Sequence, residues 1–199
     1  WKLHRRSLYD SSTNTNSQSS TPADPFIGRE PEITEIVGLL NDASCRLLTL
    51  LGSGGIGKTR LSIESIRRLT DNNFEHGVFY VPLAPLTSAD NIVTTVIGDE
   101  GTPQEELVKF LSHCNLLLVM DNFEHVLDGA DLVANILSVT PNVKILVTSR
   151  EALNLQQEWV WHVKLYLTIC GTYSWRMNKA YSQDYRYFAV DLHWMQLKE

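Results

Sequence analysis

Residues 47–60 read LLTLLGSGGIGKTR, a short apolar run that passes directly into the pattern G-x-x-x-x-G-K-T and then into a helix-forming segment. Glycines allow a tight loop in which successive backbone N–H groups point at phosphate oxygens. Lys58 would reach the β- and γ-phosphates of a nucleotide, and the Thr59 hydroxyl would bind Mg²⁺. The positive end of the following helix would add to this field. The stretch therefore predicts a phosphate-binding loop between a buried strand and a helix.

A glycine-rich segment can also be a plain turn from a strand into a helix, with no ligand. This pattern is rare by chance, because glycine makes up only about 7% of average sequences, and the flanking strand and helix make a chance match rarer still. We therefore expect a phosphate site. The residues expected to contact the nucleotide here are Gly52, Gly54, Gly55, Ile56, Gly57, Lys58, Thr59 and Arg60.

Length, charge and cysteine content narrow the class of protein. The 199 residues, 43% of them hydrophobic, suffice for one sizeable core, and the missing initial methionine suggests a piece of a longer chain. The net charge of −6 predicts no direct nucleic-acid binding by this segment. Three cysteines without a C-x-x-C pattern argue against a disulfide framework and a zinc site, and favour a reducing compartment. No apolar run approaches membrane-spanning length, so we expect a cytoplasmic location without membrane contact.

Composition divides the chain into four segments. Residues 11–25 are rich in Ser, Thr and Asn, as is typical of a flexible linker, so we interpret residues 1–10 as the end of a preceding domain. Residues 26–166 alternate apolar runs with amphipathic segments, which predicts an α/β domain with a parallel sheet covered on both faces. Residues 167–199 are aromatic-rich with little helical period, an atypical tail that a truncation, a shifted reading frame or an unusual insertion would each produce.

The expected elements follow from two periodicities. Short apolar runs bounded by polar or turn residues predict strands, and apolar residues at helical spacing predict helices. The expected strands are residues 46–51, 78–83, 116–120 and 143–148. The expected helices are residues 32–40, 58–69 and 128–139, with a further one opening at the capping pattern of residues 102–105.

An acid ends the strand expected at residues 116–120. In a parallel sheet that carries a phosphate loop, this strand lies near the loop, so Asp121 could hold Mg²⁺ directly or through water. A strand-terminal aspartate is also a common helix cap or turn residue. The phosphate loop earlier in the chain favours the metal role, and Thr59 and Asp121 are the expected metal ligands.

The strand expected at residues 143–148 is followed by Ser149 and Arg150. Ligands of open α/β sheets bind at the carboxyl ends of the strands, so Arg150 is placed to sense a terminal phosphate. The alternative is a surface arginine that pairs with Glu151 or Glu158. The position of the strand end favours the sensor, and the expected catalytic residues are Lys58, Asp121 and Arg150.

Five motifs follow one another in order: FIGREPE at 26–32, the phosphate loop at 52–59, VFYVPLA at 78–84, DNFEH at 121–125 and TSRE at 148–151. With these motifs the chain resembles the signal-transducing ATPases with numerous domains, the STAND class of P-loop NTPases that includes the NB-ARC ATPases. Within this class it is most similar to bacterial transcriptional regulators of the LuxR and SARP types. The resemblance implies a three-layer αβα sandwich with a mostly parallel sheet, here truncated before the helical lid.

The resemblance also implies a function. Ile27 and Arg29 would contact the adenine end of the nucleotide, and the cofactors would be ATP or ADP with Mg²⁺. In this class ADP holds a closed resting state, and exchange for ATP opens the protein and frees an effector domain. The implied partners are an adenine nucleotide, effector or DNA-binding domains of a longer chain, and a second copy in nucleotide-dependent self-association.

The chain departs from the class beside its metal aspartate. Many relatives place a second acid there to orient the attacking water, whereas this chain has Asn122, with Glu124 two positions on. Asparagine can orient a water molecule but cannot accept its proton, so we expect slow or absent ATP hydrolysis. Two alternatives stay open: an ordinary ATPase or phosphotransferase with a small substrate, and a truncated remnant without function.

Overall fold

The computed structural model describes residues 28–69, 74–86, 88–97 and 104–165, and five strands of that part form one sheet. The strands are β1 (Leu47–Leu51), β2 (Val78–Pro82), β3 (Leu116–Asp121), β4 (Val143–Ser149) and β5 (Glu158–His162). Their order is β2-β3-β4-β1-β5, and every neighbouring pair is parallel. The α/β class and the four expected strands are confirmed. β5 was not expected, because its apolar run is only three residues long, Trp159 to Trp161, and its side chains are at least partly exposed.

Five helices accompany the sheet in the described residues. They are α1 (Glu30–Asn41), α2 (Lys58–Arg67), α3 (Asp90–Ile97), α4 (Gln104–Leu111) and α5 (Ala130–Val139), with two 3₁₀ turns, η1 (Phe123–His125) and η2 (Leu127–Gly129), before α5. The helix expected from residue 128 therefore begins at Ala130. α3 was not expected, and the capping pattern at residues 102 and 103 lies outside the described residues. None of the described helices has the length and apolar character needed to cross a membrane.

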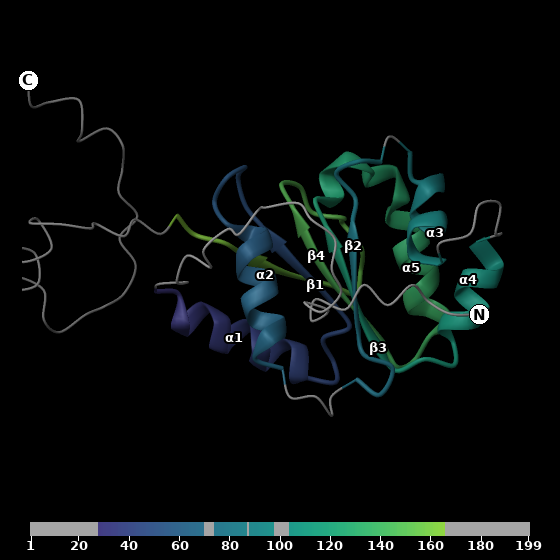
Figure 1. Ribbon diagram of the computed structural model, residues 1–199, viewed down its shortest axis with the longest axis horizontal. Coiled ribbons are helices and arrows are strands. Elements are labelled where there is room, and N and C mark those ends of the chain that lie inside the picture. Colours follow the sequence, from purple (N-terminus) through teal and green to yellow (C-terminus); the bar gives the residue numbers. More distant parts are fainter. Residues whose placement is uncertain (1–27, 70–73, 87, 98–103, 166–199) are drawn as a thin grey trace, which may run out of the picture. The chain divides into compact units, whose positions relative to one another are not determined.

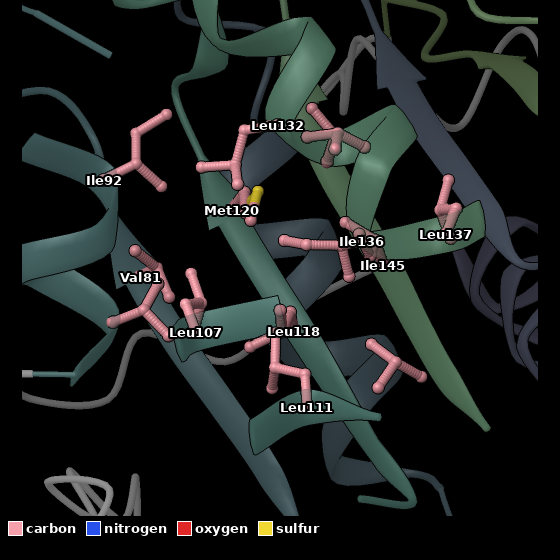
Figure 2. Close-up of a cluster of buried hydrophobic side chains, with 14 of the residues drawn as sticks. Val81, Ile92, Leu107, Leu111, Leu118, Met120, Leu132, Ile136, Leu137 and Ile145 are labelled. Carbon is pink, nitrogen blue, oxygen red and sulfur yellow. The ribbon is translucent and has the colours of Figure 1, made fainter. Parts of the chain in front are cut away.

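The helices cover the two faces of the sheet, which confirms a three-layer αβα sandwich. Figure 1 shows α1 and α2 on one side of the sheet and α3, α4 and α5 on the other. Two separate apolar cores correspond to these faces. Ile33, Ile36 and Leu61 belong to the core under α1 and α2. The larger core, drawn in Figure 2, contains Ile92 of α3, Leu107 of α4 and Ile136 of α5.

Side-chain alternation along β3 decides on which face its terminal acid lies. All six residues of this strand are buried, as is usual in the centre of a parallel sheet. Leu118 and Met120 point into the core of α3–α5, as Figure 2 shows, whereas Leu117 and Val119 belong to the core of α1 and α2. Since alternate residues share a face, Asp121 lies on the face covered by α2.

Two positively charged side chains lie near the amino ends of β1 and β4, at the edge of the sheet opposite to the end of β3 that carries Asp121. The Arg46 guanidinium donates to the carbonyl oxygens of Leu137 at 2.8 Å and Val143 at 3.1 Å. The Lys144 ammonium donates to the carbonyl oxygen of Leu40 at 2.8 Å. Positive charge at helix C-termini is favourable, so these residues fasten α5 and α1 to the sheet. The carboxyl ends of the strands carry a different set of groups, described below.

We predict that the hydroxyl of Thr49 in β1 costs stability. Thr49 is fully buried, and in the described part of the chain its Oγ1 has no hydrogen-bond partner. Leaving such a group unpaired costs about 1–3 kcal/mol. Thr49→Val keeps the branched shape and should raise the free energy of unfolding by about 1 kcal/mol in urea denaturation followed by circular dichroism. The control is the exposed Thr95→Val in α3, expected to change it by less than about 0.5 kcal/mol. A lower unfolding midpoint for Thr49→Val would contradict the prediction.

Candidate functional site

The loop between β1 and α2 has the backbone that a phosphate-binding loop requires. Gly55 and Gly57 have φ angles of 76° and 93°, in the left-handed region that favours glycine. A Cβ atom built on either would meet no atom of the described residues within 4 Å. At Gly52, in contrast, it would lie 3.2 Å from the carbonyl oxygen of Val163. The loop therefore has a packed base and an open side.

The first turn of α2 lacks the acidic residues that α1, α4 and α5 have there. α1 and α4 each have two acids in the first turn, whereas α2 has none and begins with Lys58-Thr59-Arg60. Its N-cap is Gly57, which has no side chain that could accept a hydrogen bond from the first N–H groups of the helix. The first N–H groups of a helix and the positive end of its dipole attract an anion. The start of α2 thus fits an external anion such as a phosphate group.

Lys58 lies folded over this loop. Its side-chain ammonium donates to the carbonyl oxygens of Gly52 at 2.7 Å and Ser53 at 3.1 Å. Only 7% of the residue is exposed, and burial lowers the pKa of Lys58, while the negative charge of Glu124 acts in the opposite direction. The lysine therefore lies within the phosphate loop, held by oxygen acceptors.

Three hydroxyl groups converge on the carboxylate of Asp121. Thr59 at the start of α2 donates to Oδ1 at 2.8 Å, and Thr148 near the end of β4 donates to the same oxygen at 2.5 Å. Tyr80 of β2 donates to Oδ2 at 2.7 Å. The site thus joins a nearly buried carboxylate to a threonine hydroxyl, and oxygen ligands of this kind are the ones that Mg²⁺ prefers.

Thr148 connects this carboxylate to the phosphate loop. The loop follows β1 and Asp121 ends β3, and these strands are not neighbours because β4 lies between them in the sheet. The fully buried Thr148 hydroxyl also accepts a hydrogen bond from the backbone N–H of Asn122 at 3.0 Å. One residue further on, the carbonyl oxygen of Ser149 accepts from the N–H of Gly52 at 3.2 Å. The end of β4 therefore holds both parts of the site together.

Arg150 lies across the phosphate loop. A Cβ atom built on Gly54 would be 2.9 Å from Nη2 of Arg150. The Arg150 Nε is 3.0 Å from Oε1 of Glu124, and the Arg150 backbone N–H donates to Oε2 of the same carboxylate at 3.3 Å. The alternative was a surface arginine paired with Glu151 or Glu158. The ion pair that the structure gives Arg150 is with Glu124, and the Glu158 carboxylate accepts from the backbone N–H groups of Leu153 and Asn154.

Arg29 joins the segment before α1 to the same loop. Its Nη2 donates to the carbonyl oxygen of Ile56 at 2.9 Å, and its Nε is 3.7 Å from Oε2 of Glu32. The residue has a φ angle of 63°, which allows the chain to turn directly into α1. The expected contact of Arg29 with adenine remains a prediction. Ile27 lies outside the described residues.

Sequence reasoning missed the contacts of Tyr80 and Glu124. Tyr80 stands in an apolar run, and only the register of β2 against β3, which pairs it with Val119, places its side chain two positions from Asp121 on the same face. Burial raises the pKa of Tyr80, and its hydrogen bond to Asp121 raises it further, so the hydroxyl stays a donor. For Glu124, the sequence did contain a signal, because an acid three residues after the expected metal ligand Asp121 can be expected near the same site.

Comparisons with known proteins agree with this geometry. No protein-family model matches the chain. A Mycobacterium tuberculosis protein whose name provisionally assigns it to the HTH-type transcriptional regulators is 38% identical over 131 residues, which cover 61% of this chain and 14% of that protein. An uncharacterised protein of the same species is 33% identical over 146 residues, 69% of this chain and 36% of its own length. The chain thus spans about a seventh to a third of these relatives.

Solved structures confirm the fold. Cdc6p from Pyrobaculum aerophilum superposes with a TM-score of 0.56 over 75% of this chain and 48% of its own, at 16% sequence identity. A likeness at this identity shows the architecture alone. The chain has the P-loop NTPase fold, and the predicted resemblance to P-loop ATPases and to regulator proteins is confirmed.

We predict that Tyr80 and Asp121 are energetically coupled. Tyr80→Phe removes a donor to a charged acceptor and should lower the free energy of unfolding by about 2 kcal/mol. In an Asp121→Asn background the acceptor is neutral, so the same change should cost less than about 1 kcal/mol. Urea denaturation of the two single variants and the double variant measures this coupling. An equal loss in both backgrounds would show that Tyr80 acts through packing alone.

Proposed function

We propose that this chain binds ATP or ADP together with Mg²⁺ and serves as the regulatory switch module of a longer signalling or transcription-regulating protein. One observation carries the proposal: Lys58, Thr59, Asp121 and Arg150, which come from the carboxyl-end side of three different strands, lie around one glycine-rich loop. Convergence at the carboxyl ends of parallel strands is the usual place for a ligand in this architecture. The P-loop NTPase fold makes a nucleotide the expected ligand.

The chemistry of each group suits a part of this ligand. The open side of the loop at Gly55 and Gly57, together with Lys58, would hold the phosphates. Thr59 and Asp121 would hold Mg²⁺, which neutralises phosphate charge when bound. The remaining loop residues proposed to contact the nucleotide are Gly52, Gly54, Ile56 and Arg60, with Ile27 and Arg29 at the adenine end and Arg150 as the phosphate sensor.

The switch role is supported by the relatives. One of them carries the name of an HTH-type transcriptional regulator, and this chain matches only 14% of its length. We propose that a DNA-binding or effector domain is joined to this module in the longer chain, that the module can self-associate in a nucleotide-dependent manner, and that it works in the cytoplasm. ADP would hold the resting state and ATP the active one.

Slow hydrolysis is part of the same proposal. The residue next to Asp121 is Asn122, which cannot take a proton from water, and it has a φ angle of 62°. Glu124, the nearest following acid, is engaged by Arg150. An ordinary ATPase or phosphotransferase would need a free base at this place. These contacts favour a switch over a rapid enzyme.

Nucleotide binding is the first prediction to test. The chain should bind ADP or ATP in a Mg²⁺-dependent manner, or contain ADP on extraction after purification. Lys58→Ala should lower the affinity about 10- to 100-fold, since a charge-assisted hydrogen bond is worth roughly 1.5–3 kcal/mol. Isothermal titration calorimetry measures this. The control is Lys109→Ala, which removes an exposed lysine of α4 and should leave affinity unchanged. A cooperatively folding wild type that binds neither nucleotide would favour the non-functional remnant.

Hydrolysis provides a second test. The wild type should turn over ATP at less than about 0.1 s⁻¹, compared with roughly 10 s⁻¹ for a median enzyme. Asn122→Asp introduces a carboxylate in a residue type that tolerates the left-handed backbone at this position, and should raise turnover. Phosphate release under saturating ATP measures both rates. A wild-type rate near that of a metabolic enzyme would support the alternative of an ordinary ATPase or phosphotransferase.

A further inference from the structure

The carboxylate of Glu124 forms an ion pair with Arg150, the residue expected to sense a terminal phosphate. Its two oxygens accept from Arg150 at two points, the side-chain Nε at 3.0 Å and the backbone N–H at 3.3 Å. The Glu124 side chain is only 11% exposed, whereas that of Arg150 is 60% exposed. The acid is therefore the fixed member of the pair, and the arginine is the member that is free to turn toward solvent or a ligand.

The backbone holds Glu124 in this position. Asn122, the residue after β3, has a left-handed φ angle of 62° and is the N-cap of the turn η1, which contains Glu124. Phe123 is fully buried in the core of α3–α5 and anchors this turn. The Asn122 N–H is also fixed by the Thr148 hydroxyl at 3.0 Å. Glu124 thus extends from an anchored turn toward the phosphate loop.

Glu124 also acts on the second cation of the site. Among the charges that influence the pKa of Lys58, that of Glu124 comes first, ahead of Arg150 and Asp121. Arg150 in turn lies against Gly54 of the phosphate loop. The carboxylate of Glu124 is therefore a resident anion that is paired with Arg150, and its charge also acts on Lys58, the second positive group that a nucleotide phosphate would use.

We propose, on the basis of the nucleotide site proposed above, that Glu124 is a specificity-determining residue that makes the site favour nucleoside diphosphates over triphosphates. A triphosphate carries an additional anionic group that requires Arg150 as a counter-charge. Arg150 holds Glu124 through its Nε, so a phosphate bound by its remaining guanidinium N–H groups must share the arginine with that carboxylate, which repels the added phosphate. A diphosphate leaves the ion pair intact. Specificity arises here from a resident repulsive group and not from an additional contact to the diphosphate.

The test compares ADP and ATP affinities, measured with Mg²⁺ by calorimetry, between wild type and Glu124→Gln. The amide keeps the size of the side chain and removes its charge. We expect affinity for ATP to rise about tenfold relative to affinity for ADP. The matched control is Glu151→Gln, which removes an exposed carboxylate next to Arg150 and should leave the ratio of the two affinities unchanged.

Two further variants separate this role from a structural one. Arg150→Gln should lower ATP affinity more than ADP affinity. This variant tests the proposal even if the Glu124→Gln variant does not fold. In the Arg150→Gln background, adding Glu124→Gln should still raise ATP affinity relative to ADP affinity, because the carboxylate repels the added phosphate whether or not Arg150 is present. Thermal unfolding followed by circular dichroism checks that each variant is folded.

The outcomes distinguish this inference from the proposed function. If ADP and ATP bind in a Lys58-dependent manner but Glu124→Gln leaves their ratio unchanged, or changes both affinities equally, the role of Glu124 is wrong and the nucleotide site stands. If Glu151→Gln shifts the ratio as much as Glu124→Gln, the effect is general surface charge, which also overturns the inference. If the folded wild type binds neither nucleotide, both proposals fail together.

Discussion

The carboxylate of Asp121 is the group on which the candidate site depends. It ends a strand that is buried on both sides, and it accepts hydroxyl groups from β2, β4 and the start of α2. A carboxylate that is only 7% exposed requires such donors, because burying an unpaired charge costs much more than any single hydrogen bond contributes. The three hydroxyls therefore satisfy the acid, and the acid in return fixes the distance between the phosphate loop and two strands.

The positively charged side chains near this carboxylate have oxygen acceptors from the chain itself. Lys58 donates to carbonyl oxygens of its own loop, and Arg150 pairs with Glu124 across that loop. In each of these contacts a phosphate oxygen could take the place of the present oxygen acceptor, so the same cations have an alternative partner. Glu124 lies within η1, which begins two residues after Asp121, so a ligand that displaces Glu124 from Arg150 would act on this turn.

The sequence predicted an element correctly where the residues of that element alone showed a clear pattern. The apolar runs of β1, β3 and β4 predicted strands because buried parallel strands need nearly continuous apolar sequence. α3 was missed because its β-branched residues, NIVTTVI, suit a strand as well as a helix, and its helical form depends on packing Ile92 and Val93 into the core. β5 was missed because its order comes from hydrogen bonding to β1 at the edge of the sheet.

The sequence by itself determined the α/β architecture, the glycine-rich loop after β1 with Lys58 and Thr59 behind it, and the positions of Asp121 and Arg150 at the ends of β3 and β4, because each of these is encoded in a few consecutive residues. Only the tertiary structure decided which groups touch. Tyr80 reaches Asp121 through the register of β2 on β3, and Thr148 does so because β4 lies between β1 and β3. The pairing of Arg150 with Glu124 depends on two chain segments that meet only when β3 and β4 are adjacent. Strand order and register are properties of the whole sheet, and no local pattern specifies them.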